Sequence, residues 1–296
     1  MPAEPVVVIV GAGPAGLAAA MQLRRCGVAP VVLERDEPGG LLPNAGSVEN
    51  YPGFPAGIPG WELAALMKEQ AARAGVRVTK AEATSLVREG DRILIGSTAG
   101  TIRAGAAVIA TGTEPRLWTD PKGIAEAADK VLYEIRSIRR ARGMRIGIVG
   151  AGDAAFDYAL TLSAANEVFL MNRGKEARCI PLLRERVRAA PRVVYEEETA
   201  VIAIRKENEG GLLLERTGPF GADRFKVDYL VAAIGRDPCL GWTGLSPEPS
   251  RGDGRGETFH VIGDAANGDY RQTTIAVGDG VRAAMRIARH LMGRQG

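Results

Sequence analysis

Residues 6–36 read VVVIVGAGPAGLAAAMQLRRCGVAPVVLERD, and this stretch decides the fold. An apolar run ends in the turn GAGPAG at residues 11–16, and a stretch rich in alanine and leucine follows it. A second apolar run, at residues 31–33, ends at Glu34. The pattern predicts a strand, a tight glycine turn, a helix and a parallel strand, which together form the dinucleotide-binding βαβ unit.

Each glycine of this turn has its own physical task. Gly11 permits the sharp turn, Gly13 lets a pyrophosphate approach the backbone, and Gly16 allows the helix to pack closely on the strand. The helix N-terminus supplies unsatisfied N–H groups and the positive end of a dipole. Glu34, eighteen residues after Gly16, stands where a carboxylate can accept hydrogen bonds from ribose hydroxyls. We therefore expect a dinucleotide site here, and not a turn that is merely structural.

The same plan returns in residues 145–173, RIGIVGAGDAAFDYALTLSAANEVFLMNR. Ala155 replaces the third glycine, a substitution that this motif tolerates. No acid ends the second strand, because Asn172 and Arg173 stand there, with Arg178 five residues further on. Positive charge at this point suits a 2′-phosphate, so NADPH is favoured over NADH. The alternative is that both arginines are simply solvated.

Each βαβ unit is followed by short β-like runs and by an apolar strand that ends in a glycine, Gly112 or Gly235. Two units with one plan predict two bound nucleotides. The C-terminal tail lacks a glycine turn of its own, so we expect it to return to the first domain. In that tail we expect a strand ending at Gly263 and Asp264, and a helix from about Gly278 to Leu291.

The expected fold is therefore α/β, with two Rossmann-like three-layer nucleotide-binding domains, each carrying a small β-meander, and the second inserted into the first. The expected FAD-binding domain comprises residues 1–116 and 240–296, and the expected NAD(P)H-binding domain comprises residues 117–239. Residues 113–120 and 235–244 are rich in turn residues and are expected to be the linkers.

Composition limits the class of protein. The 296 residues are 46% apolar and 25% charged, as is usual for a globular protein with a sizeable core, and a net charge of +3 is too small to indicate nucleic-acid binding. The N-terminal residues have no basic region, and no apolar run is long enough for a membrane span, so we expect a cytoplasmic protein. Cys26, Cys179 and Cys239 form no CxxC motif, and two histidines make a metal site improbable.

Several motifs together resemble the low-molecular-weight thioredoxin reductase family of pyridine nucleotide-dependent flavoproteins. The resemblance covers nearly the whole chain. It is carried by GAGPAGLAAA and GAGDAA, and by PGGLL (38–42), ENYPGF (49–54), ATG (110–112), VIGDAA (261–266) and RQTTIAVGDG (271–280).

The resemblance implies two sets of cofactor-binding residues. For FAD they are Gly11, Gly13, Pro14, Ala15, Gly16, Glu34, Arg35, Gly40, Leu41, Asn50, Thr111, Gly112, Gly263, Asp264, Arg271, Gln272 and Thr273. For NAD(P)H they are Gly150, Gly152, Asp153, Ala154, Ala155, Arg173, Arg178, Gly235 and Arg236. A helix N-terminus near Gly278 would also stabilise negative charge on the flavin. The resemblance further implies a homodimer. No side-chain acid or base is needed for hydride transfer, so no catalytic residue is assigned.

One departure from the family is informative. Thioredoxin reductases carry a CxxC motif shortly before the second glycine turn, and here that position falls within Glu134–Ser137, in the segment LYEIRSIRRARGMR (132–145). The arginines of this segment form either a solvated helical face or a docking surface for an acidic redox protein. The chain partly resembles the cysteine-free ferredoxin–NADP reductases of thioredoxin-reductase type, although Gly174 replaces one usual arginine of the 2′-phosphate motif.

Three functions follow from these observations. The first is an FAD-containing NAD(P)H oxidoreductase that lacks its own redox-active cysteine pair and passes electrons to ferredoxin or flavodoxin, a quinone or another small acceptor. The second is a thioredoxin or disulfide reductase that works directly from the flavin or through cysteines of a partner. The third is a non-catalytic redox sensor with a degenerate NAD(P)H site. The sequence favours the first.

Overall fold

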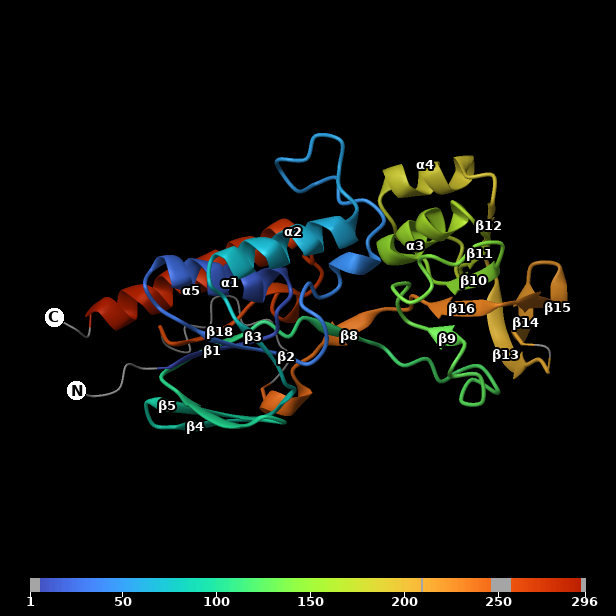
Figure 1. The fold of residues 1–296 in the computed structure, drawn as a ribbon. Helices are drawn as coiled ribbons and strands as arrows, with labels where there is room; N and C mark the ends of the chain where they lie inside the picture. Colours follow the sequence, from blue (N-terminus) through green and yellow to red (C-terminus); the bar gives the residue numbers. More distant parts are fainter. Residues whose placement is uncertain (1–5, 209, 246–256, 294–296) are drawn as a thin grey trace. The chain divides into compact units, whose positions relative to one another are not determined.

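The computed structural model describes residues 6–208, 210–245 and 257–293, so the N-terminal residues 1–5 lie outside the described part (Figure 1). The chain divides into two compact units. The first comprises residues 1–43, 48–114 and 237–296, and the second comprises residues 44–47 and 115–236. The short segment Asn44–Ser47, which the sequence places in the first domain, therefore belongs to the second unit.

The first unit is built on a five-stranded parallel sheet with the order β18-β7-β1-β2-β3. All four residues of β1 are buried, because both faces of the sheet are covered. Helices cover one face and a three-stranded antiparallel meander, β4-β5-β6, covers the other (Figure 1). The elements are β1 (Val7–Val10), α1 (Pro14–Arg25), β2 (Val31–Glu34), α2 (Gly60–Arg73), β3 (Val78–Lys80), β4 (Ala83–Glu89), β5 (Arg92–Ser97), β6 (Gly100–Ala104), β7 (Ala106–Ile109), β18 (Phe259–Val261) and α5 (Thr273–Gly293), with short 3-10 turns η1 (Leu42–Asn44), η2 (Gly241–Thr243) and η3 (Gly263–Ala265).

The second unit repeats this architecture with the parallel order β12-β11-β10-β16-β9 and the meander β13-β14-β15. Its core has two parts, one between the sheet and its helices and one between the sheet and the meander. The elements are β9 (Val131–Leu132), β10 (Arg145–Val149), α3 (Asp153–Ser163), β11 (Glu167–Met171), α4 (Pro181–Ala189), β12 (Val193–Glu196), β13 (Ala200–Lys206), β14 (Leu212–Gly218), β15 (Gly221–Val227) and β16 (Tyr229–Ala232). The α/β fold with two Rossmann-like units, which was expected from the sequence, is thus confirmed.

The two expected linkers are partly extended, and do not consist of turns alone. β8 (Thr113–Pro115) and β17 (Arg236–Pro238) pair with each other in a two-stranded sheet. A proline ends each strand, and a residue that precedes proline is driven away from helical and toward extended backbone.

Two sequence expectations are wrong. The last helix begins at Thr273 and not near Gly278, because Gly280 packs against α1 and leaves the helix unbroken. The segment 132–145, for which a solvated helical face was one of two expectations, contains no helix, and residues 135–140 form a bend and turns. Ile135 and Ile138 are buried there, and this anchors the turns to the core of the second unit while Arg136 and Arg140 are exposed.

Candidate nucleotide-binding sites

The first glycine turn joins β1 to α1 and has the backbone that its sequence requires. Gly11 has a φ of 101°, and a Cβ there would overlap the carbonyl of Ala110. A Cβ on Gly16 would overlap the carbonyl oxygen of Gly11. Gly13 is the N-cap of α1, and its missing Cβ leaves the surface open, since the nearest atom would be 3.7 Å away on Gly40. Pro14 and Ala15 then open the helix, whose first N–H groups have no intrahelical acceptor.

Glu34 ends β2 and faces this turn. Its carboxylate accepts hydrogen bonds from the amides of Ala12 (2.7 Å) and Asp36 (3.0 Å). Carboxylate oxygens have further lone pairs, so the group can still accept hydrogen bonds from ribose hydroxyls.

Arg35, which is exposed and pairs with Asp36 at 3.3 Å, lines a cavity of about 540 Å³. The cavity lies at the carboxyl ends of β2 and β3, where open α/β sheets bind ligands, and its lining residues are Arg35, Asp36, Lys80, Ala81, Glu82 and Thr98. Of these six residues, sequence reasoning predicted only Arg35 and missed the other five.

Loops that are distant in sequence complete the surroundings of the first turn. Gly40 has a φ of 58°, and a Cβ on it would lie 3.1 Å from the Cα of Gly13, so the loop with Leu41 lies beside the turn. Asn50 donates a hydrogen bond of 2.8 Å to Gln272, which brings together two expected FAD residues that are 222 positions apart.

Two other expected residues have structural partners. The Thr111 hydroxyl donates to the carbonyl of Cys239 (2.7 Å), and the Gly112 carbonyl accepts from the amide of the same residue (3.0 Å). Both contacts tie the return segment after β17 to the end of β7.

The C-terminal motif lies against α1. Gly263 has a φ of 65°, and a Cβ on it would be 2.9 Å from the Cβ of Ala15. Asp279, which sequence reasoning missed, accepts hydrogen bonds from the Gly263 amide (3.3 Å) and from Asn267 (2.6 Å) and so fixes this turn next to Asp264. Because α5 begins at Thr273, its positive N-terminal end directly follows Arg271 and Gln272.

The second glycine turn joins β10 to α3 in the same way. Gly150 has a φ of 156°, and a Cβ there would lie 2.5 Å from the carbonyl oxygen of Ala233. Ala155 is fully buried beneath it, so this alanine occupies the position of the third glycine. A Cβ on Gly152 would meet nothing within 4 Å, which leaves the N-terminus of α3 open to a ligand beside the exposed Ala154. Asp153 accepts the amide of Ile180 (2.8 Å).

The loop after β11 carries the two arginines expected to bind a 2′-phosphate. The amide of Arg178 donates to the carbonyl of Ala151 (2.6 Å), which fixes this end of the loop beside the glycine turn. The buried Asn172 organises the other end by donating to the carbonyl of Glu176 (3.0 Å) and accepting from the amide of Gly174 (2.9 Å). Arg173 and Arg178 are exposed, and neither forms an ion pair with any residue that the structure describes. The guanidinium groups of Arg173 and Arg178 could therefore bind a 2′-phosphate next to this glycine turn.

The segment Glu134–Ser137, where the sequence resemblance implies a CxxC motif in relatives, contributes to a polar cluster within the second unit. Glu134 accepts a hydrogen bond from Asn44 (3.0 Å) and pairs with Arg236 at 3.2 Å, just after Gly235 in the chain. Asn44 in turn accepts the amide of Arg136 (2.9 Å). Burial, and then the Glu134 charge, raise the pKa of the neighbouring Tyr158 to about 12, so its hydroxyl stays protonated. The ion pair between Arg236 and Glu134 is a contact that the sequence does not predict.

None of the three cysteines is paired in a disulfide. Burial, and then Asp153, raise the pKa of the Cys179 thiol; burial, and then Glu114, raise the pKa of the Cys239 thiol. A raised pKa makes a thiol a poor nucleophile at neutral pH. Among the described residues, no group of three or more His, Cys, Asp or Glu side chains could hold a metal ion, and no helix is long and apolar enough to cross a membrane.

Comparison with known proteins agrees with this geometry. Residues 5–243 match the family model described as pyridine nucleotide-disulphide oxidoreductase. Thioredoxin reductase of Streptomyces coelicolor is 30% identical over 94% of this chain and 91% of its own length, and that of Streptomyces clavuligerus is 31% identical over 96% and 93%. Crystal structures of thioredoxin reductases from Lactococcus lactis and T. acidophilum superpose with TM-scores of 0.88 and 0.87 at 26% and 25% identity, each covering 98% of this chain and all of the other.

The paired glycine turns, the open helix N-termini and the match along almost the whole chain lead to one assignment. The chain belongs to the pyridine nucleotide-disulphide oxidoreductase family and is a thioredoxin reductase-like member of it, a flavin-dependent oxidoreductase in a family that uses FAD and NADPH.

Proposed function

We propose that this protein oxidises NADPH with FAD held in the first unit, and passes the electrons to an acceptor without a cysteine pair of its own. When bound, FAD supplies the hydride-accepting and electron-passing chemistry. The residues around Gly13 and Glu34 would bind its pyrophosphate and ribose, and the N-terminus of α5 would face its negative charge. In the second unit, the turn at Gly152 would bind the NADPH pyrophosphate, and Arg173 and Arg178 its 2′-phosphate.

The observation that supports an unusual acceptor is the cluster around Glu134. The position where thioredoxin reductases keep their CxxC motif holds a carboxylate that is bonded to Asn44 and Arg236, and residues 134–137 contain no cysteine. Cys26 lies at the C-terminal end of α1, and the thiols of Cys179 and Cys239 have raised pKa values. These observations support, as the acceptor, a ferredoxin or flavodoxin, a quinone or another small molecule, and not a dithiol relayed through the chain.

A cysteine-free variant tests this proposal. Cys26→Ser, Cys179→Ser and Cys239→Ala together should leave both the anaerobic reduction of bound flavin by NADPH and the turnover of a quinone acceptor within about twofold of the parent rates. Both rates can be followed through the flavin absorbance in a stopped-flow instrument. A variant whose flavin is still reduced by NADPH, but which no longer passes electrons on, would show that the cysteines carry them.

A second candidate function is supported by the relatives, several of which are thioredoxin reductases. In this alternative the protein reduces a disulfide directly from the flavin or through cysteines of a partner. The anaerobically reduced holoprotein should be offered thioredoxin and a quinone in parallel. Faster reoxidation by thioredoxin would favour the disulfide reductase, and faster reoxidation by the quinone would favour the first proposal.

For a protein acceptor, the exposed arginines at residues 136–142 are the proposed docking surface. Arg136, Arg140 and Arg142 are exposed, and residues 135–152 contain no acidic residue. Clustered positive charge of this kind accelerates encounter with an acidic partner at low salt. Replacing these three arginines by Glu should slow reduction of an acidic protein acceptor about tenfold or more at low ionic strength and leave reduction of the flavin by NADPH unchanged.

A matched control carries the same charge change elsewhere. Arg77, Arg92 and Arg103 of the first unit are also exposed and lie outside the proposed docking surface, so their triple replacement by Glu should have a much smaller effect on the protein acceptor. Equal rates for the two triple variants would leave the 136–142 segment as an ordinary solvated surface.

We also propose that the protein is a homodimer in a reducing cytoplasm. The three free cysteines support a reducing compartment. Sedimentation equilibrium of the FAD-loaded protein tests the dimer, and a mass of about 31.3 kDa would show a monomer.

A further inference from the structure

Three consecutive glutamates, Glu196 to Glu198, lie against the loop that carries Arg173 and Arg178; Glu196 ends β12, and the other two follow it. Backbone hydrogen bonds hold them there: the Asn172 amide donates to the Glu196 carbonyl (2.8 Å), and the Glu198 amide donates to the Gly174 carbonyl (3.0 Å). The Thr199 amide then donates to the Asn172 carbonyl (2.9 Å). The acids therefore stand, in fixed register, next to the proposed 2′-phosphate site.

This arrangement raises an electrostatic problem. A carboxylate at the ribose edge of a Rossmann sheet favours a 2′-hydroxyl, and it repels a 2′-phosphate. Three of them beside the loop would favour NADH over NADPH unless their charges were offset.

Each glutamate has a basic partner. Glu197 pairs with Arg184 at 3.9 Å, and Glu198 pairs with Lys175 at 3.7 Å, but these pairs are long and their side chains are 38% to 79% exposed. Water and salt screen exposed pairs strongly, so they contribute little to the local field.

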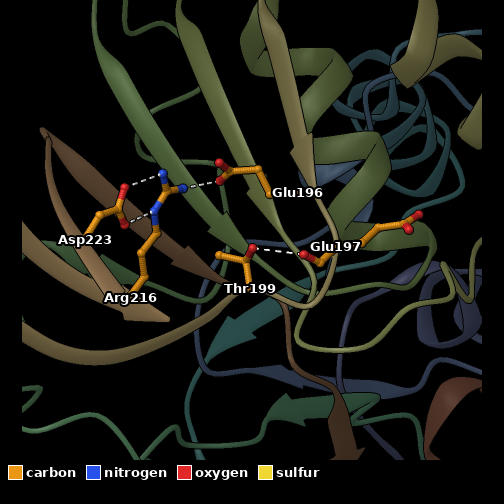
Figure 2. Close-up of polar contacts among 5 residues, drawn as sticks. All are labelled: Glu196, Glu197, Thr199, Arg216 and Asp223. Carbon is orange, nitrogen blue, oxygen red and sulfur yellow. Dashed lines mark hydrogen bonds and ion pairs between the residues drawn. The ribbon is translucent and has the colours of Figure 1, made fainter. Parts of the chain in front are cut away.

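The pair formed by Glu196 is different. Its carboxylate accepts a hydrogen bond from Arg216 of β14, and their side chains are only 24% and 16% exposed. Figure 2 shows the Arg216 guanidinium between Glu196 and Asp223, to which it also donates from Nε (2.7 Å) and Nη2 (3.1 Å). The guanidinium also lies over the ring of Phe225, 4.3 Å from its centre. A charge in this less solvated position acts over a longer distance than one in water.

The turn after β12 has a backbone conformation that a glutamate rarely adopts. Glu198 has a φ of 51° and is the one non-glycine residue in the left-handed region among those described. The Thr199 hydroxyl supports the turn by donating to the carbonyl of Glu197 (3.0 Å) (Figure 2). Such strain persists only where the surroundings fix it, so the acids cannot easily move away from the loop.

We propose that Arg216 is a specificity-determining residue for NADPH over NADH, because it neutralises Glu196 next to the loop that carries Arg173 and Arg178. Arg216 does not touch the nucleotide in this arrangement; it is a positioning residue that acts through Glu196. This role of Arg216 rests on the proposed 2′-phosphate site. By neutralising Glu196 at the end of β12, Arg216 would allow a phosphate to bind near that carboxylate.

The test is equilibrium binding of NADP⁺ and NAD⁺ to the FAD-loaded protein by isothermal titration calorimetry. Arg216→Gln should weaken NADP⁺ binding about five- to tenfold and change NAD⁺ binding less than about twofold, since only NADP⁺ carries the repelled phosphate. Adding Glu196→Gln to that variant should restore NADP⁺ binding. Asp223→Asn is the matched control, because it removes the other partner of Arg216 and leaves the Arg216–Glu196 pair in place.

Several outcomes would overturn the inference. Equal weakening of both nucleotides by Arg216→Gln would mean general damage, and failure of Glu196→Gln to restore NADP⁺ binding would exclude the charge of Glu196. If Arg216→Gln does not fold, Glu196→Gln alone decides: it should strengthen NADP⁺ binding about twofold and leave NAD⁺ unchanged, and no change would refute the proposal. Arg173→Gln and Arg178→Gln test the site itself, because unchanged NADP⁺ binding in both would place the 2′-phosphate elsewhere whatever Arg216→Gln does.

Discussion

At the scale of single residues, two glycines of the first turn meet different constraints. A Cβ on Gly16 would overlap the carbonyl oxygen of Gly11 in the protein itself, whereas a Cβ on Gly13 would meet only Gly40, at 3.7 Å. Gly13 has a φ of −73°, which any residue adopts. Gly16 is therefore required by the fold, whereas Gly13 is required only by a ligand that must approach the backbone.

The two alanine variants should separate these roles. Gly16→Ala should lower the free energy of unfolding of the FAD-free protein by about 2–3 kcal/mol, because the backbone must shift to admit the methyl group. Gly13→Ala should leave that free energy nearly unchanged and still weaken FAD binding about tenfold or more, since the methyl group occupies the approach of the pyrophosphate.

Denaturant unfolding of the FAD-free protein and flavin content after reconstitution are the two measurements. A Gly13→Ala protein that retains full FAD affinity would contradict a pyrophosphate at this turn. A Gly16→Ala protein of normal stability would contradict the close packing of α1 on β1.

At the scale of elements, α5 carries two glycines in opposite surroundings. Gly280 is buried, and a Cβ on it would overlap the carbonyl of Ala15 in α1, so this glycine permits the close crossing of the two helices. Gly278 is exposed, and a Cβ on it would meet nothing within 4 Å.

Alanine at these two positions should therefore change stability in opposite directions. Gly278→Ala should stabilise the FAD-free protein by about 0.5–1 kcal/mol, which is the usual gain from Gly to Ala in a helix interior. Gly280→Ala should destabilise it by about 2 kcal/mol or more, because α1 and α5 would be forced apart. Thermal unfolding of both variants checks the pair, and a stabilising Gly280→Ala would show that the crossing is looser than described.

The same helix shows what the sequence can and cannot predict. Both glycine turns and their flanking strands follow from local pattern, since the apolar runs and the glycines are adjacent in the chain. The start of α5 does not, because the role of Gly280 depends on a helix more than 250 residues earlier. A solvated helical face was one of two expectations for residues 132–145, yet the buried Ile135 and Ile138 hold residues 135–140 in a bend and turns.

The candidate site residues, and the residues that position them, divide along the same line. Gly13, Glu34 and Arg173 could be assigned from their distance to a glycine turn. Asp279 and Arg216 could not, because Asp279 reaches Gly263 from another element and Arg216 reaches Glu196 from the meander. No local motif marks such partners.

At the scale of the whole molecule, the return of the chain after residue 257 closes the first unit and partly buries His260. β18 adds to the edge of β7, and His260 lies there with its ring bonded to the carbonyl of Glu257 (3.2 Å). Burial, and to a smaller degree the charge of Arg286, lower the pKa of His260 below its ordinary value of 6.5, against the opposing effect of that hydrogen bond. The histidine therefore remains neutral in the folded protein at pH values where the unfolded chain would already bind a proton.

The sign of the pH dependence follows from this linkage. Below pH 6.5 the unfolded state binds more protons at this residue than the folded state, so the contribution of His260 to stability is fully present above that value and is lost as the pH falls toward the lower folded pKa. Urea unfolding at about pH 7.5 and about pH 5.5 should show a smaller loss of stability on acidification for His260→Gln than for the parent.

His290→Gln serves as the control. That histidine is the only other one in the chain, and its Nδ1 lies 2.7 Å from the Glu257 carboxylate, so it has an acidic partner where His260 has a carbonyl and a nearby arginine. If the partly buried His260 is responsible, the smaller loss of stability on acidification should be confined to His260→Gln. A His260→Gln protein that loses as much stability as the parent would show that the closure of the first unit does not depend on a neutral imidazole.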